Sequence, residues 1–134
     1  MAELADFGML AARVCLSAVF LYSGIDKSIH WRDGLAEVSA LGLPRPALVL
    51  TLTIIVQLGA GLMVVLGIHA FAGALVLLAF TGLATLMAHR FWESGGQERR
   101  MKLTVGLEHL AIIGGLLLVI VSGPGALSLD RLLP

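Results

Sequence analysis

Four apolar runs, each about as long as a bilayer is thick, dominate this chain of 134 residues. The hydrocarbon core of a bilayer is about 30 Å thick, and a helix of about 20 apolar residues spans it. Inside lipid every backbone N–H and C=O group must be paired within the protein, so such runs fold as helices. The sequence therefore predicts an all-α, polytopic membrane four-helix bundle, a single membrane domain over residues 1–134 with helices at about 9–25, 47–66, 70–91 and 103–122.

The composition excludes several other classes of protein. Hydrophobic residues make up 58% of the chain and charged residues 13%, against about 45–50% and about 25% in soluble domains. A chain this short cannot hide so much apolar surface inside a globule. Nine basic residues balance nine acidic ones, which argues against a nucleic-acid partner. The single cysteine, Cys15, excludes an internal disulfide and a cysteine zinc cage.

Two connections between the runs have a recognisable local pattern. Gly67–His69 separates the second and third runs and predicts a tight helical hairpin, with one very long helix as the alternative. The segment Trp31–Leu41 predicts a short interfacial helix, with Trp31 at the depth of the lipid headgroups.

Lysine and arginine are unevenly distributed between the two sides of the predicted bundle. Seven of the nine lie in the first and third connections, which share a side, and the other two are Arg13 and Arg131. Basic loops stay in the cytoplasm. We therefore expect a multi-pass protein of a bacterial-type cytoplasmic (inner) membrane, with both chain termini outside.

Small and polar residues mark the faces through which membrane helices pack. Read at 3.6 residues per turn, each predicted helix has one such stripe. The four stripes are Arg13, Ser17, Phe20, Gly24 and Lys27; Thr53, Gln57, Ala60 and Gly61; Thr81, Thr85 and His89; and Thr104, Glu108, Ala111 and Gly115. We expect these stripes to face the bundle interior, and tight packing alone is the simplest role for their glycines and threonines.

The order of several short motifs resembles a known family. The motifs are Arg13, Val19–Gly24 (VFLYSG), Lys27, Leu41–Pro44 (LGLP), Gln57–Leu62 (QLGAGL), Leu110–Leu117 (LAIIGGLL), Gly123–Gly125 (GPG) and Ser128–Asp130 (SLD). Together they resemble the DoxX family of small four-helix membrane proteins over nearly the whole chain. The resemblance implies the four-helix fold and, through the family's link to a thiosulfate:quinone oxidoreductase, an accessory or anchoring partner of a redox enzyme. Many family members have a glutamate where this chain has Gln57, and Lys-Asn where it has Glu108-His109.

Glu108 and His89 are the candidate catalytic residues. Glu108 lies about five residues into the fourth run, or about 8 Å deep at 1.5 Å per residue. A carboxylate at that depth needs a cation or a hydrogen-bond donor. We expect its side chain to meet that of His89 and the pair to handle protons beside a quinone, in a pocket lined by Lys27, Gln57, Thr85 and His109. The alternative is a buried ion-pair network that only braces the bundle.

The remaining ionisable residues give weaker signals. Arg13 and Asp130 are expected to form a structural ion pair between the two ends of the chain, with snorkelling of Arg13 as the alternative. His89 and His109 lie at similar depth, but His109 is about 100° around its helix from Glu108. A haem between them is therefore disfavoured, and no metal site is expected because cysteines or carboxylates at ligand spacing are missing from the sequence.

These observations predict an accessory or anchoring membrane subunit of a redox enzyme complex, with a quinone site at its cytoplasmic-side end. Such a chain is a quinone-interacting or non-catalytic subunit rather than a stand-alone enzyme. Quinone is the expected cofactor, with none bound covalently. The expected partners are the lipid bilayer and a redox enzyme or further copies of the chain. A non-catalytic membrane scaffold is the main alternative function, and a small oligomeric permease is the second.

Overall fold

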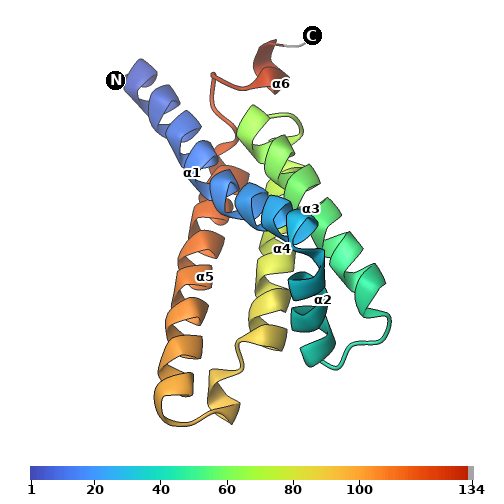
Figure 1. Cartoon of the computed structure of the whole chain (residues 1–134). Helices are drawn as coiled ribbons and strands as arrows, with labels where there is room; N and C mark the ends of the chain where they lie inside the picture. Colours follow the sequence, from blue (N-terminus) through green and yellow to red (C-terminus); the bar gives the residue numbers. More distant parts are fainter. Residues whose placement is uncertain (133–134) are drawn as a thin grey trace.

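The computed structural model describes residues 1–132, and helices account for nearly all of that part of the chain (Figure 1). Four helices are long and apolar enough to cross a membrane, the third together with the short helix that follows it. The predicted all-α fold with four spans is confirmed. In chain order the helices are α1 (Ala2–Ile29), α2 (Trp31–Ala40), α3 (Pro46–Leu66), α4 (Ala70–Ala88), η1 (Phe91–Glu93), α5 (Gly96–Ser122) and α6 (Leu129–Leu132).

The first and last long helices extend beyond the predicted ranges. α1 begins seven residues before the expected start at residue 9, and α5 begins seven residues before residue 103. Hydropathy detects only the apolar part of a helix, whereas the helical backbone continues into polar flanks. In the first turns of α5, Lys102 pairs with Glu98 four residues earlier at 2.7 Å, an arrangement that supports a helix. The short helix predicted after the first span is present as α2, and its place at the membrane interface stays a prediction.

A tight turn joins α3 to α4, as the sequence predicts. Gly67 ends α3 with φ at 70°, the left-handed region that glycine adopts readily. The N–H of Ile68 donates to the carbonyl of Met63 at 3.0 Å. The alternative of one continuous helix is excluded.

Small residues bring α1, α3 and α4 into close contact. Gly24 of α1 packs against Leu58, and Gly61 of α3 packs against Leu21. Gly73 of α4 lies against Met63 in the same way. The core between the helices consists of Phe20, Ala60, Val64, Ala74, Leu77, Leu116 and Val119. The predicted stripe of α1 is buried from Arg13 to Gly24, so its inward orientation is confirmed.

α5 packs differently, because α1 crosses it rather than running beside it. The crossing lies where Gly115 meets the side chain of Leu16. From there towards η1 the two helices diverge, and α5 continues alongside α4 (Figure 1). The ribbons of α1 and α5 are therefore far apart at the end where η1 and α2 lie (Figure 1).

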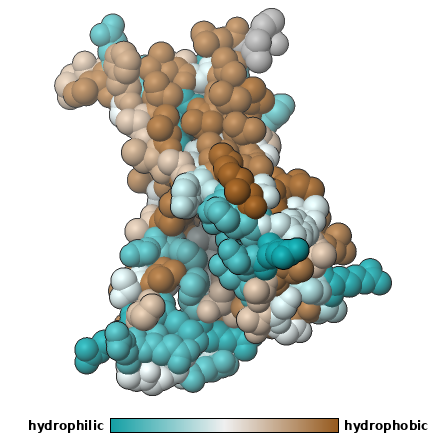
Figure 2. All heavy atoms as spheres, in the orientation of Figure 1, coloured by the Kyte–Doolittle hydropathy of each residue, from teal (hydrophilic) through white to brown (hydrophobic). Residues whose placement is uncertain are grey.

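The same end carries most of the polar surface. Figure 2 shows hydrophilic residues gathered in the lower part of the molecule, around η1, the start of α5 and α2, and hydrophobic residues over the upper part. The seven basic residues of the two connections belong to this polar end.

Candidate functional site

Thr85, His89 and His109 form a polar cluster between the end of α4 and α5. The hydroxyl of Thr85 lies 2.7 Å from Nδ1 of His109 and donates to the carbonyl of Thr81, also at 2.7 Å. Since a hydroxyl has one proton, Thr85 accepts from Nδ1–H of His109. A neutral His109 then has a bare Nε2, which accepts hydrogen bonds.

His89 is the second ring of this cluster. It follows the last residue of α4, and its N–H donates to the carbonyl of Thr85 at 3.0 Å. Its ring meets His109 edge to face, with 5.1 Å between centroids and 79° between planes. Both histidines are half-buried. The structure thus brings together two imidazole rings, each of which can bind a proton.

An apolar groove of about 300 Å³ lies beside the cluster, between α4 and α5. Gly82 of α4 and Gly106 of α5 leave room for the groove, because no other side chain packs against either glycine. Thr85 is the polar residue of the lining, and the others are Leu86, Leu110 and Ile113. A polar cluster therefore adjoins an apolar channel at membrane depth.

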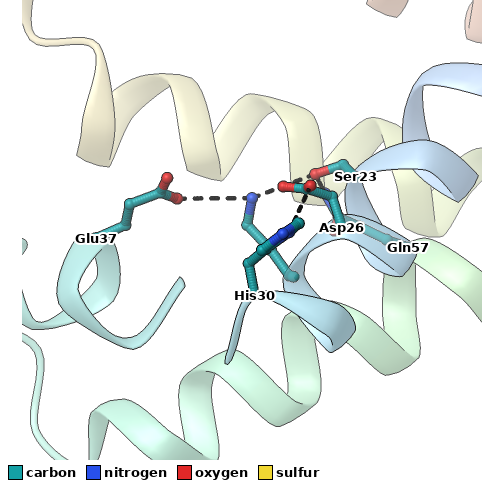
Figure 3. Close-up of polar contacts among 6 residues, drawn as sticks. Ser23, Asp26, His30, Glu37 and Gln57 are labelled. Carbon is teal, nitrogen blue, oxygen red and sulfur yellow. Dashed lines mark hydrogen bonds and ion pairs between the residues drawn. The ribbon is translucent and has the colours of Figure 1, made fainter. Parts of the chain in front are cut away.

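A second polar cluster lies across the bundle, where α1 and α3 meet (Figure 3). Oγ of Ser23 accepts from the amide of Gln57 at 3.1 Å and from Nζ of Lys27 at 3.3 Å. Nζ of Lys27 also lies 3.6 Å from the carboxylate of Glu37 on α2. Gln57 is only 6% exposed, and its Oε1 has no partner among the described residues.

A polar cavity of about 290 Å³ adjoins this second cluster at the junction of α1 and α2. The ring of His30 lies 3.0 Å from Asp26, one turn earlier. The cavity is lined by Asp26, Lys27, His30, Asp33, Gly34 and Glu37. Sequence reasoning missed Ser23, although its place one turn before Lys27 was a usable signal.

Glu108 is placed differently from the expectation. It is exposed, and within residues 1–132 it makes no hydrogen bond or ion pair. His89 meets His109 instead, which corrects the expected Glu108–His89 contact. Glu108 lies on the same side of α5 as Gly115. The two residues are seven apart, and seven steps of 100° end within about 20° of the starting direction. That face is directed towards α1, but α1 has diverged at this level and leaves Glu108 uncovered.

The expected Arg13–Asp130 ion pair is also corrected. The Arg13 side chain is 0% exposed. Its guanidinium donates to the carbonyls of Val64 at 3.4 Å and Val65 at 3.2 Å, and to that of Leu127. Asp130 is exposed, and its backbone N–H bonds to Gly67. The last carbonyls of a helix lack partners within it, so Arg13 caps α3 instead of pairing with a carboxylate.

The predicted site residues therefore fall into three places. Thr85, His89 and His109 are together on α4 and α5. Lys27 and Gln57 are together on α1 and α3, and Glu108 stands alone on the open side of α5.

Comparison with known proteins gives one family and two full-length relatives. The family model described as DoxX matches residues 8–90. Inner membrane protein YqjF of Escherichia coli (strain K12) is 32% identical over 99% of this chain and 97% of its own length. Inner membrane protein YphA of the same strain is 26% identical over 94% of both chains. No solved structure matches the chain.

Proposed function

Because this chain belongs to the DoxX family of membrane proteins, we propose that it is an accessory membrane subunit of a redox enzyme and binds quinone between α4 and α5. The observation that carries the proposal is the histidine cluster beside the apolar groove. A quinone has a ring with two hydrogen-bonding oxygens and a long apolar tail. The polar cluster suits the ring with its two oxygens, and the adjoining apolar groove suits the tail.

The residues present fit such a molecule in three respects. His109, held through Nδ1 by Thr85, offers Nε2 towards a ring oxygen. Gly82 and Gly106 leave a channel that a flat or flexible apolar group fills without displacing side chains. The groove lies on the outer surface of α4 and α5, so an amphiphile reaches it sideways from the lipid.

When bound, the quinone accepts two electrons and two protons from the assembled complex. His89 and His109 hold and pass protons because imidazole gains and loses a proton near neutral pH. The two rings are in edge-to-face contact, so a proton passes between them in a single short step. The electron donor is a separate enzyme in this proposal, and the chain supplies binding and protons.

The test is the quinone content and quinone affinity of the purified protein. We expect wild-type protein in mild detergent to retain quinone on extraction and chromatography. Thr85→Val keeps the side-chain shape and removes the hydroxyl that orients His109. It should weaken quinone affinity about tenfold, the value of one hydrogen bond in a low-dielectric site, and His109→Ala should act in the same direction.

His69→Asn is the matched control. His69 is exposed in the α3–α4 turn, with φ at 46°, a conformation that asparagine tolerates. Its substitution should leave quinone affinity unchanged. If wild-type protein neither retains quinone nor binds a short-chain quinone saturably, the quinone site is refuted and the scaffold function is favoured. Equal affinity in wild type and Thr85→Val would refute the assignment to α4 and α5.

A further inference from the structure

We propose that the open face of α5 around Glu108 is the docking site for a transmembrane helix of the partner enzyme, and that this helix carries one basic side chain at the depth of Glu108. This inference rests on the proposed function, because it names how an accessory subunit holds its partner. It uses residues outside the quinone groove.

The face consists of small and polar residues that the other parts of residues 1–132 leave exposed. Thr104, Glu108 and Ala111 share the side of Gly115 and are all exposed. Gly115, where α1 crosses, marks the direction in which this side points. Small residues allow the backbones of membrane helices to approach closely, so the face has the composition of a packed interface.

The side of α1 that meets α5 at Leu16 is polar further along the helix. On α1, Ser23 and Lys27 are seven and eleven residues beyond Leu16, which places them within about 20° of its direction. Glu108 is likewise seven residues from the crossing at Gly115. Ser23 and Glu108 are thus about 10 Å below the crossing on their respective helices.

Charge identifies the occupant. Glu108 lies six residues past Lys102, about 9 Å into the apolar part of α5, and has no cation in contact within residues 1–132. A lone carboxylate facing lipid is costly, and such residues normally pair inside a bundle. Lys27, the cation on the polar side of α1, is already engaged with Glu37 and Ser23. A second helix that brings its own cation satisfies both the carboxylate and the small-residue face.

The experiment uses a synthetic single-span peptide as the probe. Its leucine–alanine host carries one lysine about 9 Å from the end that aligns with the polar end of this chain. A matched peptide has leucine at that position. Energy transfer in phosphatidylcholine vesicles, from a labelled peptide to Gly95→Cys in a Cys15→Ala background, measures binding. We expect the lysine peptide to bind about tenfold more tightly than the leucine peptide.

Glu108→Gln should abolish this preference, because glutamine keeps the shape and loses the charge. Asp130→Asn is the matched control, since Asp130 is an exposed carboxylate near the other end of the chain, and the preference should persist there. Equal binding of the two peptides, or a preference that survives Glu108→Gln, would overturn the proposal.

Three further measurements separate the other occupants. A wild-type dimer that Glu108→Gln dissociates would mean that a second copy covers the face, which overturns the proposal. If the preference for the lysine peptide appears only in Lys27→Met, Lys27 of the same chain pairs with Glu108 in the wild-type protein. This result would also overturn the proposal. Quinone content of the same samples shows whether a failure concerns docking alone or the proposed function too.

Discussion

At the scale of single residues, Arg13 shows how a buried cation is accommodated without a carboxylate. Its guanidinium reaches three carbonyl oxygens, two at the end of α3 and one in the segment after α5. Carbonyls at the C-terminal end of a helix carry partial negative charge, which favours a cation there. One side chain thus ties together α1, the α3–α4 turn and the end of the chain.

Replacing Arg13 by methionine should lower the free energy of unfolding on the order of 3 kcal/mol, because buried carbonyls then lose their donor. Reversible unfolding in mixed detergent micelles measures this quantity. Arg131→Met is the control, since Arg131 is exposed and its side chain makes no hydrogen bond within residues 1–132. Equal losses in the two variants would contradict the capping role.

Gly67 offers a second test at the same place. A methyl group added at Gly67 would collide with the Arg13 guanidinium and with Ser128, whereas Gly42 has the same backbone conformation, φ 71° against 70°, and open space. Gly67→Ala should therefore destabilise the protein by about 2 kcal/mol more than Gly42→Ala, a typical cost of overpacking. The backbone strain cancels between the two, so the difference in unfolding free energy reports the contact. A difference near zero would show that the turn adjusts freely.

At the scale of elements, the helices follow from the sequence, and their mutual placement follows only in part. Apolar length predicts four spans, and the stripe of α1 predicts its buried face from Arg13 to Gly24. The partners of Arg13 are backbone carbonyl oxygens. Because every residue has such an oxygen, the pattern of side chains does not indicate which ones Arg13 contacts. The expectation that the stripe of α5 faces the bundle interior is wrong for Thr104, Glu108 and Ala111, which are exposed. Of this stripe only Gly115 packs against α1, because the two helices cross at an angle that no residue pattern encodes. For that reason Glu108 and His89 are apart, and the clusters around His109 and Lys27 are separate.

The crossing of α1 and α5 depends on the absence of a side chain at Gly115. A Cβ atom there would lie 2.7 Å from the side chain of Leu16, whereas one at Gly114 would meet nothing within 4 Å. Gly115→Val should lower the unfolding free energy by about 1–3 kcal/mol more than Gly114→Val. Both variants share the helix propensity of valine, so the comparison isolates the crossing. Indistinguishable stabilities would mean that α1 moves aside at no cost.

At the scale of the whole molecule, the polar end of Figure 2 carries seven of the nine basic residues. If basic loops remain in the cytoplasm, this end faces inward and both chain termini face outward. In a Cys15→Ala background, a membrane-impermeant thiol reagent should label Gly95→Cys only in inside-out vesicles and Ala126→Cys only in right-side-out vesicles. The reverse labelling pattern would invert the orientation and move both polar clusters to the other leaflet.

Arg13 and Leu127 are in contact although they lie 114 residues apart in the sequence. The ribosome therefore makes the two partners at different times. Arg13 is synthesised 114 residues before its third acceptor. Until Leu127 is made, the cation in α1 has the carbonyls of Val64 and Val65 as its acceptors within the protein and otherwise relies on water or lipid headgroups. A chain that stops before residue 127 would therefore present this charge to the membrane with one of its three acceptors missing.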